Sequence, residues 1–188
     1  MSPRKEVNMI TVLDVGCGSN PRGTINLDLY QGTSRHHRFD YDPKDIENFL
    51  NGDGARLPYR DKSVDIIISS HCLEHIPTPL EAVKDWERVA RRRVIINIPN
   101  NPTLEEFPAH IYSWSLISFK AFLEQVFPDV RVWPNSPIHD LNANRLLNRL
   151  LRINLIKKPI QRLLSRFLGL QITAECTCNP QSSKRGMK

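Results

Sequence analysis

The stretch LDVGCGSNPRGTINLDL, residues 13–29, decides the fold and points to a class of ligand. It starts at the end of a β-rich run, residues 9–16, and closes with a second run, residues 24–30, in which apolar and polar residues alternate. Gly16 and Gly18 stand between the two runs, where the backbone can approach a ligand because no side chain intervenes. We therefore predict two strands joined by a ligand-binding loop.

The rest of the chain alternates between apolar runs and amphipathic segments. Residues 63–76 open with a nearly continuous apolar run, which suits a strand buried on both faces of a parallel sheet. Residues 113–127 space their apolar residues as a helix does, with Ser115 as the expected N-cap. The other predicted strands lie in residues 49–53, 92–99, 129–134 and 170–178, and the other predicted helix lies in residues 79–91. This alternation predicts an α/β fold, a mostly parallel sheet covered by helices on both faces.

The composition is that of a soluble globular chain, with 188 residues of which 40% are apolar and 24% charged. No apolar run reaches membrane-spanning length, and the first residues lack the apolar core of a signal peptide. The four cysteines do not have the spacing of a disulfide framework or of a zinc site, so we predict reduced thiols, a cytoplasmic location and no bound metal. They are Cys17, Cys72, Cys176 and Cys178.

The net charge of +6 is concentrated in residues 141–168, which hold seven Lys and Arg residues and no acidic residue. Apolar and basic residues there alternate as in two amphipathic helices, the second starting at Pro159. Three interpretations stay open: a cover packed on the domain or on a second copy in a homodimer, a contact with an anionic membrane or lipid-linked substrate, or a grip on nucleic acid. We expect one domain, residues 1–188, with a core (9–133 and 169–178), a basic helical insertion (140–168) and a disordered tail (179–188).

The glycine loop suits an adenosine without phosphates better than a dinucleotide. A dinucleotide loop would read G-x-G-x-x-G, followed by an acidic residue about 20 positions later. Here Pro21 takes the place of the third glycine, and Asp28 follows Gly18 by only ten residues. The first helix is therefore predicted to be cut short between Gly18 and Thr24.

Carboxylates stand where an adenosyl group would need acceptors. Asp28 ends a predicted strand and can accept hydrogen bonds from ribose hydroxyls. Asp53 can accept from the adenine amino group, with Ala55 and Leu57 beside the ring. Asp14 is placed to orient the loop or to reach an amino group. Together these residues predict a site for S-adenosylmethionine.

Three segments carry a resemblance to a known family: TVLDVGCGSNPRGTINLDLY (11–30), NGDGARLPYRDKSVDIIISSHCLEHI (51–76) and HIYSWSLISFKAFLEQVF (110–127). In this order they resemble the class I S-adenosylmethionine-dependent methyltransferases, in particular the small-molecule group with a methyltransferase type 11-like domain. The resemblance covers about residues 9–133. It implies a Rossmann-like sheet of seven strands whose last strand is antiparallel.

The resemblance also implies which residues hold the cofactor. It assigns the methionine end to the first glycine loop, the ribose to the end of the second strand and the adenine to the segment after the third strand, with two further residues after the fourth strand. The implied residues are Asp14, Gly16, Cys17, Gly18, Asp28, Leu29, Asp53, Gly54, Ala55, Ser70 and His71. The chain departs from the family in its short first helix and in residues 31–48, where no second helix is evident.

Methyl transfer needs an aligned nucleophile, and a general base only where the acceptor must lose a proton. The predicted catalytic or acceptor-binding residues are His75, His110 and Tyr112, with His71 and Glu74 beside them. Each also has a structural interpretation: His75 orders its turn, His110 and Tyr112 pack a loop, and Glu74 accepts local hydrogen bonds. Cys17 is interpreted as a small residue that fits the loop rather than as a catalytic thiol.

The predicted function is methyl transfer from S-adenosylmethionine to a small-molecule or lipid-like acceptor. The fourth strand is followed by SHCLEH rather than by N/D-P-P-Y/F, the tetrapeptide typical of enzymes that methylate amino groups of nucleic acids and proteins. Two alternatives stay open: an RNA methyltransferase whose basic helices bind phosphates, and a non-catalytic cofactor-binding or membrane-associated module.

Overall fold

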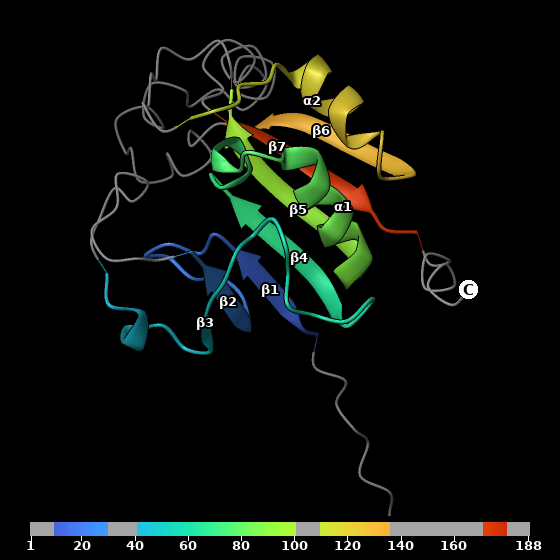
Figure 1. Ribbon diagram of the computed structural model, residues 1–188. Coiled ribbons are helices and arrows are strands. Elements are labelled where there is room, and N and C mark those ends of the chain that lie inside the picture. Colours follow the sequence, from blue (N-terminus) through green and yellow to red (C-terminus); the bar gives the residue numbers. More distant parts are fainter. Residues whose placement is uncertain (1–9, 30–40, 101–109, 136–170, 180–188) are drawn as a thin grey trace, which may run out of the picture.

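The computed structural model describes residues 10–29, 41–100, 110–135 and 171–179, which build one sheet of seven strands (Figure 1). The strand order is β3-β2-β1-β4-β5-β7-β6. The strands are β1 (Val12–Val15), β2 (Ile25–Asp28), β3 (Phe49–Asn51), β4 (Val64–Ser70), β5 (Ala90–Pro99), β6 (Asp129–Asn135) and β7 (Gln171–Thr177). Neighbouring strands from β3 to β5 are parallel, whereas β7 is antiparallel to both β5 and β6. This confirms the predicted α/β sheet with an antiparallel last strand.

The middle of the sheet is fully buried, as its apolar runs predict. Leu13 on β1 lies in register with Ile67 on β4, which in turn lies in register with Val94 on β5. All three side chains are inaccessible to solvent. Along β5, Val94, Ile96 and Ile98 are buried while the residues between them are half-buried. One face of β5 is therefore packed more tightly than the other.

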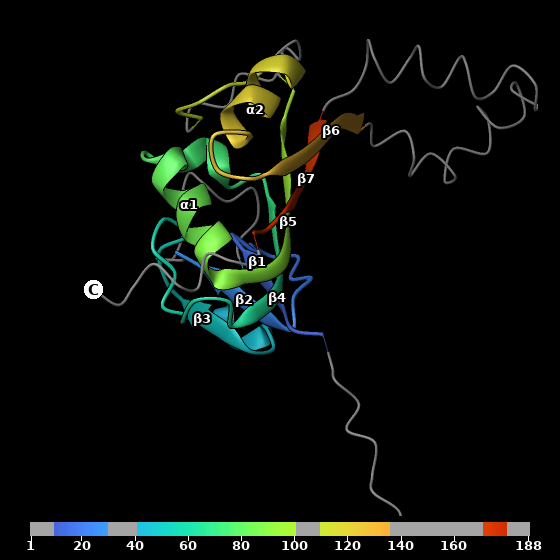
Figure 2. The ribbon, with the colours of Figure 1, turned by 90° about the vertical axis from the view of Figure 1, so that its right-hand side faces the viewer.

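The two α-helices, α1 (Pro79–Val89) and α2 (Leu116–Leu123), cover that tightly packed face. Figure 2, in which the sheet is seen close to edge-on, shows both helices on the same side of it. Each helix inserts an aromatic side chain into the core, Trp86 from α1 and Phe119 from α2, and both side chains are fully buried. Two short 3-10 helices complete the elements, η1 (Pro43–Asp45) and η2 (Leu73–His75).

The start of α2 has the cap that the sequence predicts. The Ser115 side chain accepts a hydrogen bond from the Ser118 N–H at 3.2 Å, and the Ser118 side chain accepts from the Ser115 N–H at 2.9 Å. This reciprocal pair satisfies two N–H groups that have no partner within the helix.

Within the described residues both α-helices lie on one face of the sheet, and the expected cover on the opposite face stays a prediction. The chain between β1 and β2 is described throughout and turns without a helix, so the first helix is absent rather than shortened. Side chains take the backbone donors that a helix would use: Arg22 N–H donates to Asp14 at 2.9 Å and Gly23 N–H donates to Asn26 at 3.0 Å. Such local bonds favour a turn over a helix.

Several predictions concern residues outside the described part of the chain. The basic helical insertion (140–168) lies there, as does the predicted tail (179–188) except for Asn179. In residues 31–48, the described portion from residue 41 onward holds only the short η1. Among the helices that the structure describes, none has both the length and the apolar character to cross a membrane.

Candidate functional site

The glycine loop follows β1 and has the backbone shape that only glycine adopts easily. Gly16 has φ of 72° and Gly18 has φ of 52°. A Cβ on Gly16 would lie 2.5 Å from the Cβ of Cys72, so this position has no room for a side chain. Among the described residues, no atom lies within 4 Å of where a Cβ on Gly18 would stand. The loop thus packs tightly against the fold at Gly16 and borders open space at Gly18, where a ligand could lie.

Asp28, at the carboxyl end of β2, holds this loop in place. Its Oδ2 accepts a hydrogen bond from Gly18 N–H at 2.8 Å, and the carbonyl oxygen of Leu27 accepts from Gly16 N–H at 2.8 Å. Asp28 is almost completely buried, with 6% of its surface exposed. The bond is charge-assisted, because the acceptor is a carboxylate. The predicted ribose residue is therefore also the residue that shapes the glycine loop.

Asp14, on β1, is a fully buried carboxylate with one unsatisfied oxygen. Its Oδ2 accepts from Arg22 N–H at 2.9 Å and lies 3.6 Å from the Arg22 guanidinium. Its Oδ1 has no hydrogen-bond partner among the described residues. Burial raises the pKa of Asp14, although Arg22 opposes the shift. An acceptor left over beside the loop is what the amino group of a ligand would need.

The segment after β3, residues 52–57, carries the predicted adenine residues and is called the adenine segment below. Asp53 is exposed, and its Oδ1 accepts from Ala55 N–H at 2.8 Å, which shapes a tight turn. Gly52 N–H donates to the carbonyl oxygen of Asp28 at 3.0 Å, so this segment begins beside the ribose residue. Leu57 packs in the core with 3% of its surface exposed, and its place beside the adenine ring stays a prediction. Ala55, which is half-buried, stays the predicted apolar neighbour of the ring.

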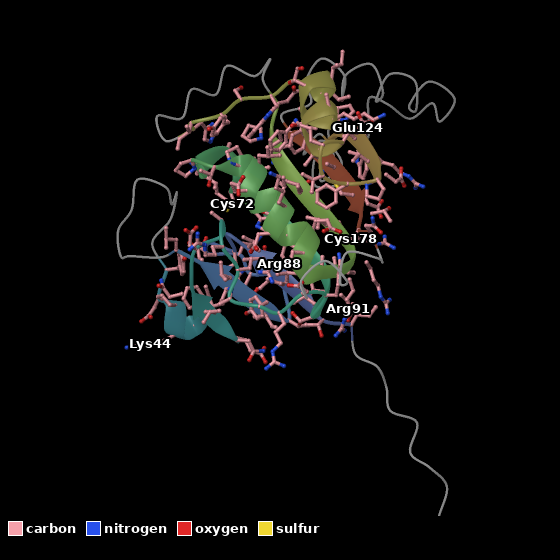
Figure 3. The ribbon with its side chains drawn as sticks, turned by 45° about the vertical axis from the view of Figure 1, so that its right-hand side comes forward. Lys44, Cys72, Arg88, Arg91, Glu124 and Cys178 are labelled. Atoms are coloured by element: carbon pink, nitrogen blue, oxygen red, sulfur yellow. The ribbon has the colours of Figure 1, made fainter. Side chains whose placement is uncertain are left out.

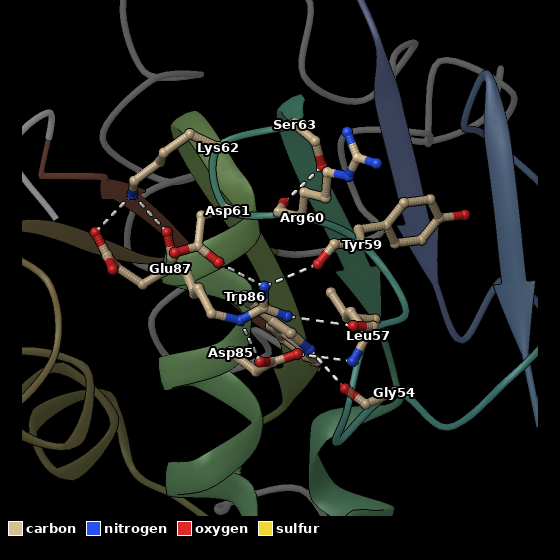
Figure 4. Close-up of polar contacts among 11 residues, drawn as sticks. Gly54, Leu57, Tyr59, Arg60, Asp61, Lys62, Ser63, Asp85, Trp86 and Glu87 are labelled. Atoms are coloured by element: carbon tan, nitrogen blue, oxygen red, sulfur yellow. Dashed lines mark hydrogen bonds and ion pairs between the residues drawn. The ribbon is translucent and has the colours of Figure 1, made fainter. Parts of the chain in front are cut away.

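Helix α1 holds this segment through hydrogen bonds to its backbone (Figure 4). The Trp86 indole N–H donates to the carbonyl oxygen of Gly54 at 2.7 Å, and Asp85 accepts from Leu57 N–H at 2.7 Å. Arg88 donates to Asp85, to Asp61 and to the carbonyl oxygens of Tyr59 and Leu57. The sequence marks Trp86 as part of an apolar helical face, but it gives no sign that the indole nitrogen binds the adenine segment.

A hollow of about 630 Å³ lies between this segment and α1. Asp53, Ala55 and Arg56 line it from the segment, and Thr78, Glu81, Lys84, Asp85 and Arg88 line it from the α1 side. It does not reach the glycine loop or Asp28. The hollow therefore adjoins the expected adenine position without containing the whole site.

At the carboxyl end of β4 the chain turns sharply. Ser70 is the last residue of β4 and is half-buried. His71 adopts φ of 52°, which is rare for a residue other than glycine, and its N–H donates to the carbonyl oxygen of Asn97 at 2.9 Å. This places Ser70 and His71 beyond the same sheet edge as the glycine loop and Asp28. Cys72, labelled in Figure 3, comes next and packs against Gly16.

Beyond this turn the structure brings together the predicted residues His75 and His110. Their rings lie 4.8 Å apart in an edge-to-face arrangement. The carbonyl oxygen of Glu74 accepts from Ile111 N–H at 2.9 Å and from Tyr112 N–H at 3.2 Å, which anchors the later segment beside η2. The Tyr112 hydroxyl donates to the carbonyl oxygen of Pro77 at 2.8 Å. Its ring stacks on Trp114 at 5.5 Å.

Glu74 itself differs from its expected function as a local hydrogen-bond acceptor. Its side chain is 1% exposed, and neither carboxylate oxygen has a hydrogen-bond partner among the described residues. Its Oε1 lies 3.5 Å from His71 Nδ1 and 3.9 Å from His110 Nε2, which are ion-pair distances when the imidazole is protonated. The sequence places Glu74 among the candidates near the methyl group but does not predict its burial, which depends on the later segment folding against η2.

The four cysteines are free thiols, as predicted. Burial raises the pKa of Cys17 to about 12, and the nearby carboxylates of Asp28 and Asp14 add to this effect. A thiol with such a pKa stays neutral near pH 7, whereas catalytic thiols act as thiolates. Cys17 therefore fits its interpretation as a small residue of the loop. Leu29, the remaining predicted cofactor residue, follows β2 and is 55% exposed.

Comparisons with known proteins show what the chain is similar to. Residues 13–97 match a family model described as a methyltransferase domain. A Mycolicibacterium smegmatis protein described as a "Probable S-adenosylmethionine-dependent methyltransferase" is 31% identical over 103 residues, which are 49% of this chain and 39% of that protein. The chain therefore spans about two fifths of the length of this relative.

Solved structures share the fold at low sequence identity. A SAM-dependent methyltransferase from Archaeoglobus fulgidus is 19% identical, with a TM-score of 0.58 over 90% of this chain and 86% of the other. A phosphoethanolamine N-methyltransferase from Haemonchus contortus, solved with phosphomonomethylethanolamine and S-adenosylhomocysteine, is 16% identical, with a TM-score of 0.57 over 92% of this chain and 50% of the other. Over residues 13–97, therefore, the chain is similar to the methyltransferase domain family, and it shares its fold with S-adenosylmethionine-dependent methyltransferases of known structure.

Proposed function

We propose that this chain transfers a methyl group from S-adenosylmethionine to a small-molecule or lipid-like acceptor. When bound, S-adenosylmethionine supplies an electrophilic methyl group on a sulfonium. The chain's own residues would bind this molecule along the carboxyl ends of β1, β2 and β3. Asp28 would hold the ribose hydroxyls and Asp53 the adenine amino group, while the unsatisfied Asp14 oxygen would accept from the amino group of the methionine part.

The observation that carries the proposal is the charge and shape of the glycine loop. Two buried carboxylates, Asp14 and Asp28, border a loop whose open side is at Gly18. A pyrophosphate needs the N–H groups at the start of a helix, and the chain between β1 and β2 has no helix. Carboxylates repel phosphates but favour a ligand with a sulfonium and an amino group. The site therefore suits a cationic adenosyl compound rather than a dinucleotide.

The residues near the transferred methyl would position the acceptor. His75 and His110 lie together beyond β4, and Tyr112 is tied to Pro77 through its hydroxyl. A histidine there can take a proton from a hydroxyl or ammonium acceptor when the acceptor must lose one. The absence of the N/D-P-P-Y/F tetrapeptide after β4 favours a small acceptor over an amino group in a nucleic acid or protein.

Calorimetric titration with S-adenosylhomocysteine, the product of the proposed reaction, tests the site without knowledge of the acceptor. Asp28→Ala removes an acceptor worth about 1.5–3 kcal/mol, so we expect the affinity to fall roughly 10- to 100-fold. Asp28→Asn, which keeps the shape of the side chain, serves as a second variant if Asp28→Ala unfolds. Asp129→Ala, an exposed carboxylate on β6, is the matched control and should bind as the wild type does.

Two results would contradict the proposal. One is a wild-type protein that takes up no S-adenosylhomocysteine at millimolar concentration. The other is tighter binding of a pyridine dinucleotide than of S-adenosylhomocysteine. If binding is confirmed, incubation with methyl-labelled cofactor and fractions of small molecules, lipids and RNA then identifies the acceptor class, and label that enters RNA alone would refute the proposed acceptor.

A further inference from the structure

We propose that Glu74, His75 and His110 bind a divalent transition-metal cation. Each residue offers one ligand atom, a carboxylate oxygen or an imidazole nitrogen, and these atoms all lie within 4.8 Å of one another. Ligand atoms around one zinc-sized ion lie roughly 3–4 Å apart, given metal–ligand distances of about 2.0–2.2 Å. The three side chains therefore need only small rotations to close on an ion.

The unsatisfied Glu74 carboxylate is the observation that points to a cation. A buried carboxylate is strongly disfavoured unless hydrogen bonds or an opposite charge compensate it. Among the described residues neither Glu74 oxygen has a hydrogen bond, and no Lys or Arg nitrogen lies within 4.0 Å of them. Two imidazole nitrogens lie near Glu74 Oε1, His71 Nδ1 at 3.5 Å and His110 Nε2 at 3.9 Å. A metal cation bound by the carboxylate and the imidazoles would compensate the buried carboxylate of Glu74.

The backbone holds the three residues in place before any ion binds. Glu74 and His75 are consecutive residues of η2, and the carbonyl oxygen of Glu74 accepts from the N–H groups of Ile111 and Tyr112, directly after His110. The Tyr112 hydroxyl fastens the same segment to Pro77. His110 is thus anchored beside η2 by three hydrogen bonds that do not involve its own side chain. Such preorganisation strengthens ligand binding, because less conformational freedom is lost.

The ligand set favours a transition metal over Mg²⁺ or Ca²⁺. Two imidazoles and one carboxylate suit Zn²⁺, Mn²⁺, Fe²⁺, Co²⁺ or Ni²⁺, whereas Mg²⁺ and Ca²⁺ prefer oxygen ligands. Three protein ligands leave further coordination positions, which a hydroxyl, carboxylate or phosphate oxygen of a substrate can take. The use of these positions for the methyl acceptor rests on the proposed function, whereas the metal site itself does not.

The test is metal binding by the full chain, freed of any affinity tag and stripped with a chelator. Titration with ZnCl₂, MnCl₂ and CoCl₂, followed by calorimetry and by the visible spectrum of bound Co²⁺, should show one ion per chain for at least one metal at micromolar concentration. Glu74→Gln and His110→Ala should each weaken that binding by at least about tenfold. Glu124→Gln, which changes an exposed carboxylate at the end of α2, should leave it unchanged.

Glu74→Gln also provides a readout independent of affinity. Added metal should raise the Tm of the wild type and should not raise that of the variant, because only the wild type has the carboxylate ligand. The proposal is overturned if none of the three metals binds more tightly than millimolar, or if Glu74→Gln binds metal as the wild type does. Titration of the metal-free protein with S-adenosylhomocysteine tests the cofactor site separately, so failure of one proposal is distinguishable from failure of the other.

Discussion

Substitution of Trp86 by Phe should destabilise the fold and loosen the adenine segment. The indole of Trp86 is completely buried on α1, and its N–H donates to the carbonyl oxygen of Gly54 at 2.7 Å. Phenylalanine keeps an aromatic ring in the core but has no donor. The Gly54 carbonyl, whose residue is also buried, would then lose this partner in a place with little access to water.

The expected magnitude follows from two contributions. Leaving a buried carbonyl without its donor costs about 1–3 kcal/mol. The smaller ring leaves a cavity, which adds about 1 kcal/mol. The sum of roughly 2–4 kcal/mol lowers the Tm by about 4–16 °C for a domain of this size. Because Gly54 lies between the predicted adenine residues, we also expect weaker binding of S-adenosylhomocysteine.

Thermal and urea unfolding of wild type, Trp86→Phe and Trp133→Phe measures this effect. Trp133, on β6, is 41% exposed and should tolerate the same change within about 0.5 kcal/mol. Equal stability losses in both variants would refute the reasoning, because the effect would then belong to tryptophan as such. Unchanged stability of Trp86→Phe would show that the bond to Gly54 holds nothing in place.

Two other predictions concern the glycine loop and the pH dependence of stability. Gly16→Ala should unfold the protein or destabilise it by more than about 2 kcal/mol, because the added Cβ would collide with Cys72. Gly18→Ala should cost about 1 kcal/mol of stability from its φ alone and should abolish cofactor binding. Calorimetry and thermal unfolding distinguish the two variants, and equal stability losses would contradict the packing described. The pKa of Asp65 is lowered, first by the hydrogen bond from Thr11 N–H and then by Arg92 and Arg91. The ionised carboxylate of Asp65 therefore stabilises the fold above about pH 4, and this stabilisation disappears as the pH falls through the lowered folded-state pKa. Asp65→Asn should therefore cost about 1 kcal/mol near pH 7 and progressively less below pH 4 in urea unfolding, and a difference that grows on acidification would show the sign to be wrong.

The sheet could be predicted from the sequence because its strands are short and each has one dominant pattern. The alternation in residues 24–30 and the apolar run that begins residues 63–76 led to strands at β2 and β4, each within a few residues. The cap at Ser115 was equally predictable, because capping depends on residues next to one another in sequence. The missing first helix was predicted only as a shortening. Its absence depends on backbone N–H groups that donate to the side chains of Asp14 and Asn26, and these bonds require both strands to be in place.

The candidate site was predictable where residues act through motifs and not where they act through packing. Asp28 follows from its place at the end of a strand, and its bond to Gly18 agrees with that place. His75 and His110 were predicted separately, and no local pattern indicated that their rings would meet. The burial of Glu74 depends on the same long-range contact, since its backbone and the segment after His110 bind each other. Contacts between distant segments have no period in the sequence, so pattern reading misses them.

Helix α1 connects the two halves of the candidate site. Its last turns hold the segment of Gly54 through Trp86 and Arg88, and its first residue, Pro79, comes two positions after Pro77, which accepts the Tyr112 hydroxyl. The adenine segment and the cluster of Glu74, His75 and His110 are therefore attached to opposite ends of one rigid element, in addition to their attachment to the sheet. Because a helix moves as a unit, a displacement that loosens the Gly54 end also displaces the Pro77 end. A Trp86 substitution should consequently affect metal binding at Glu74, His75 and His110 as well as cofactor binding, whereas substitutions on β6 should affect neither.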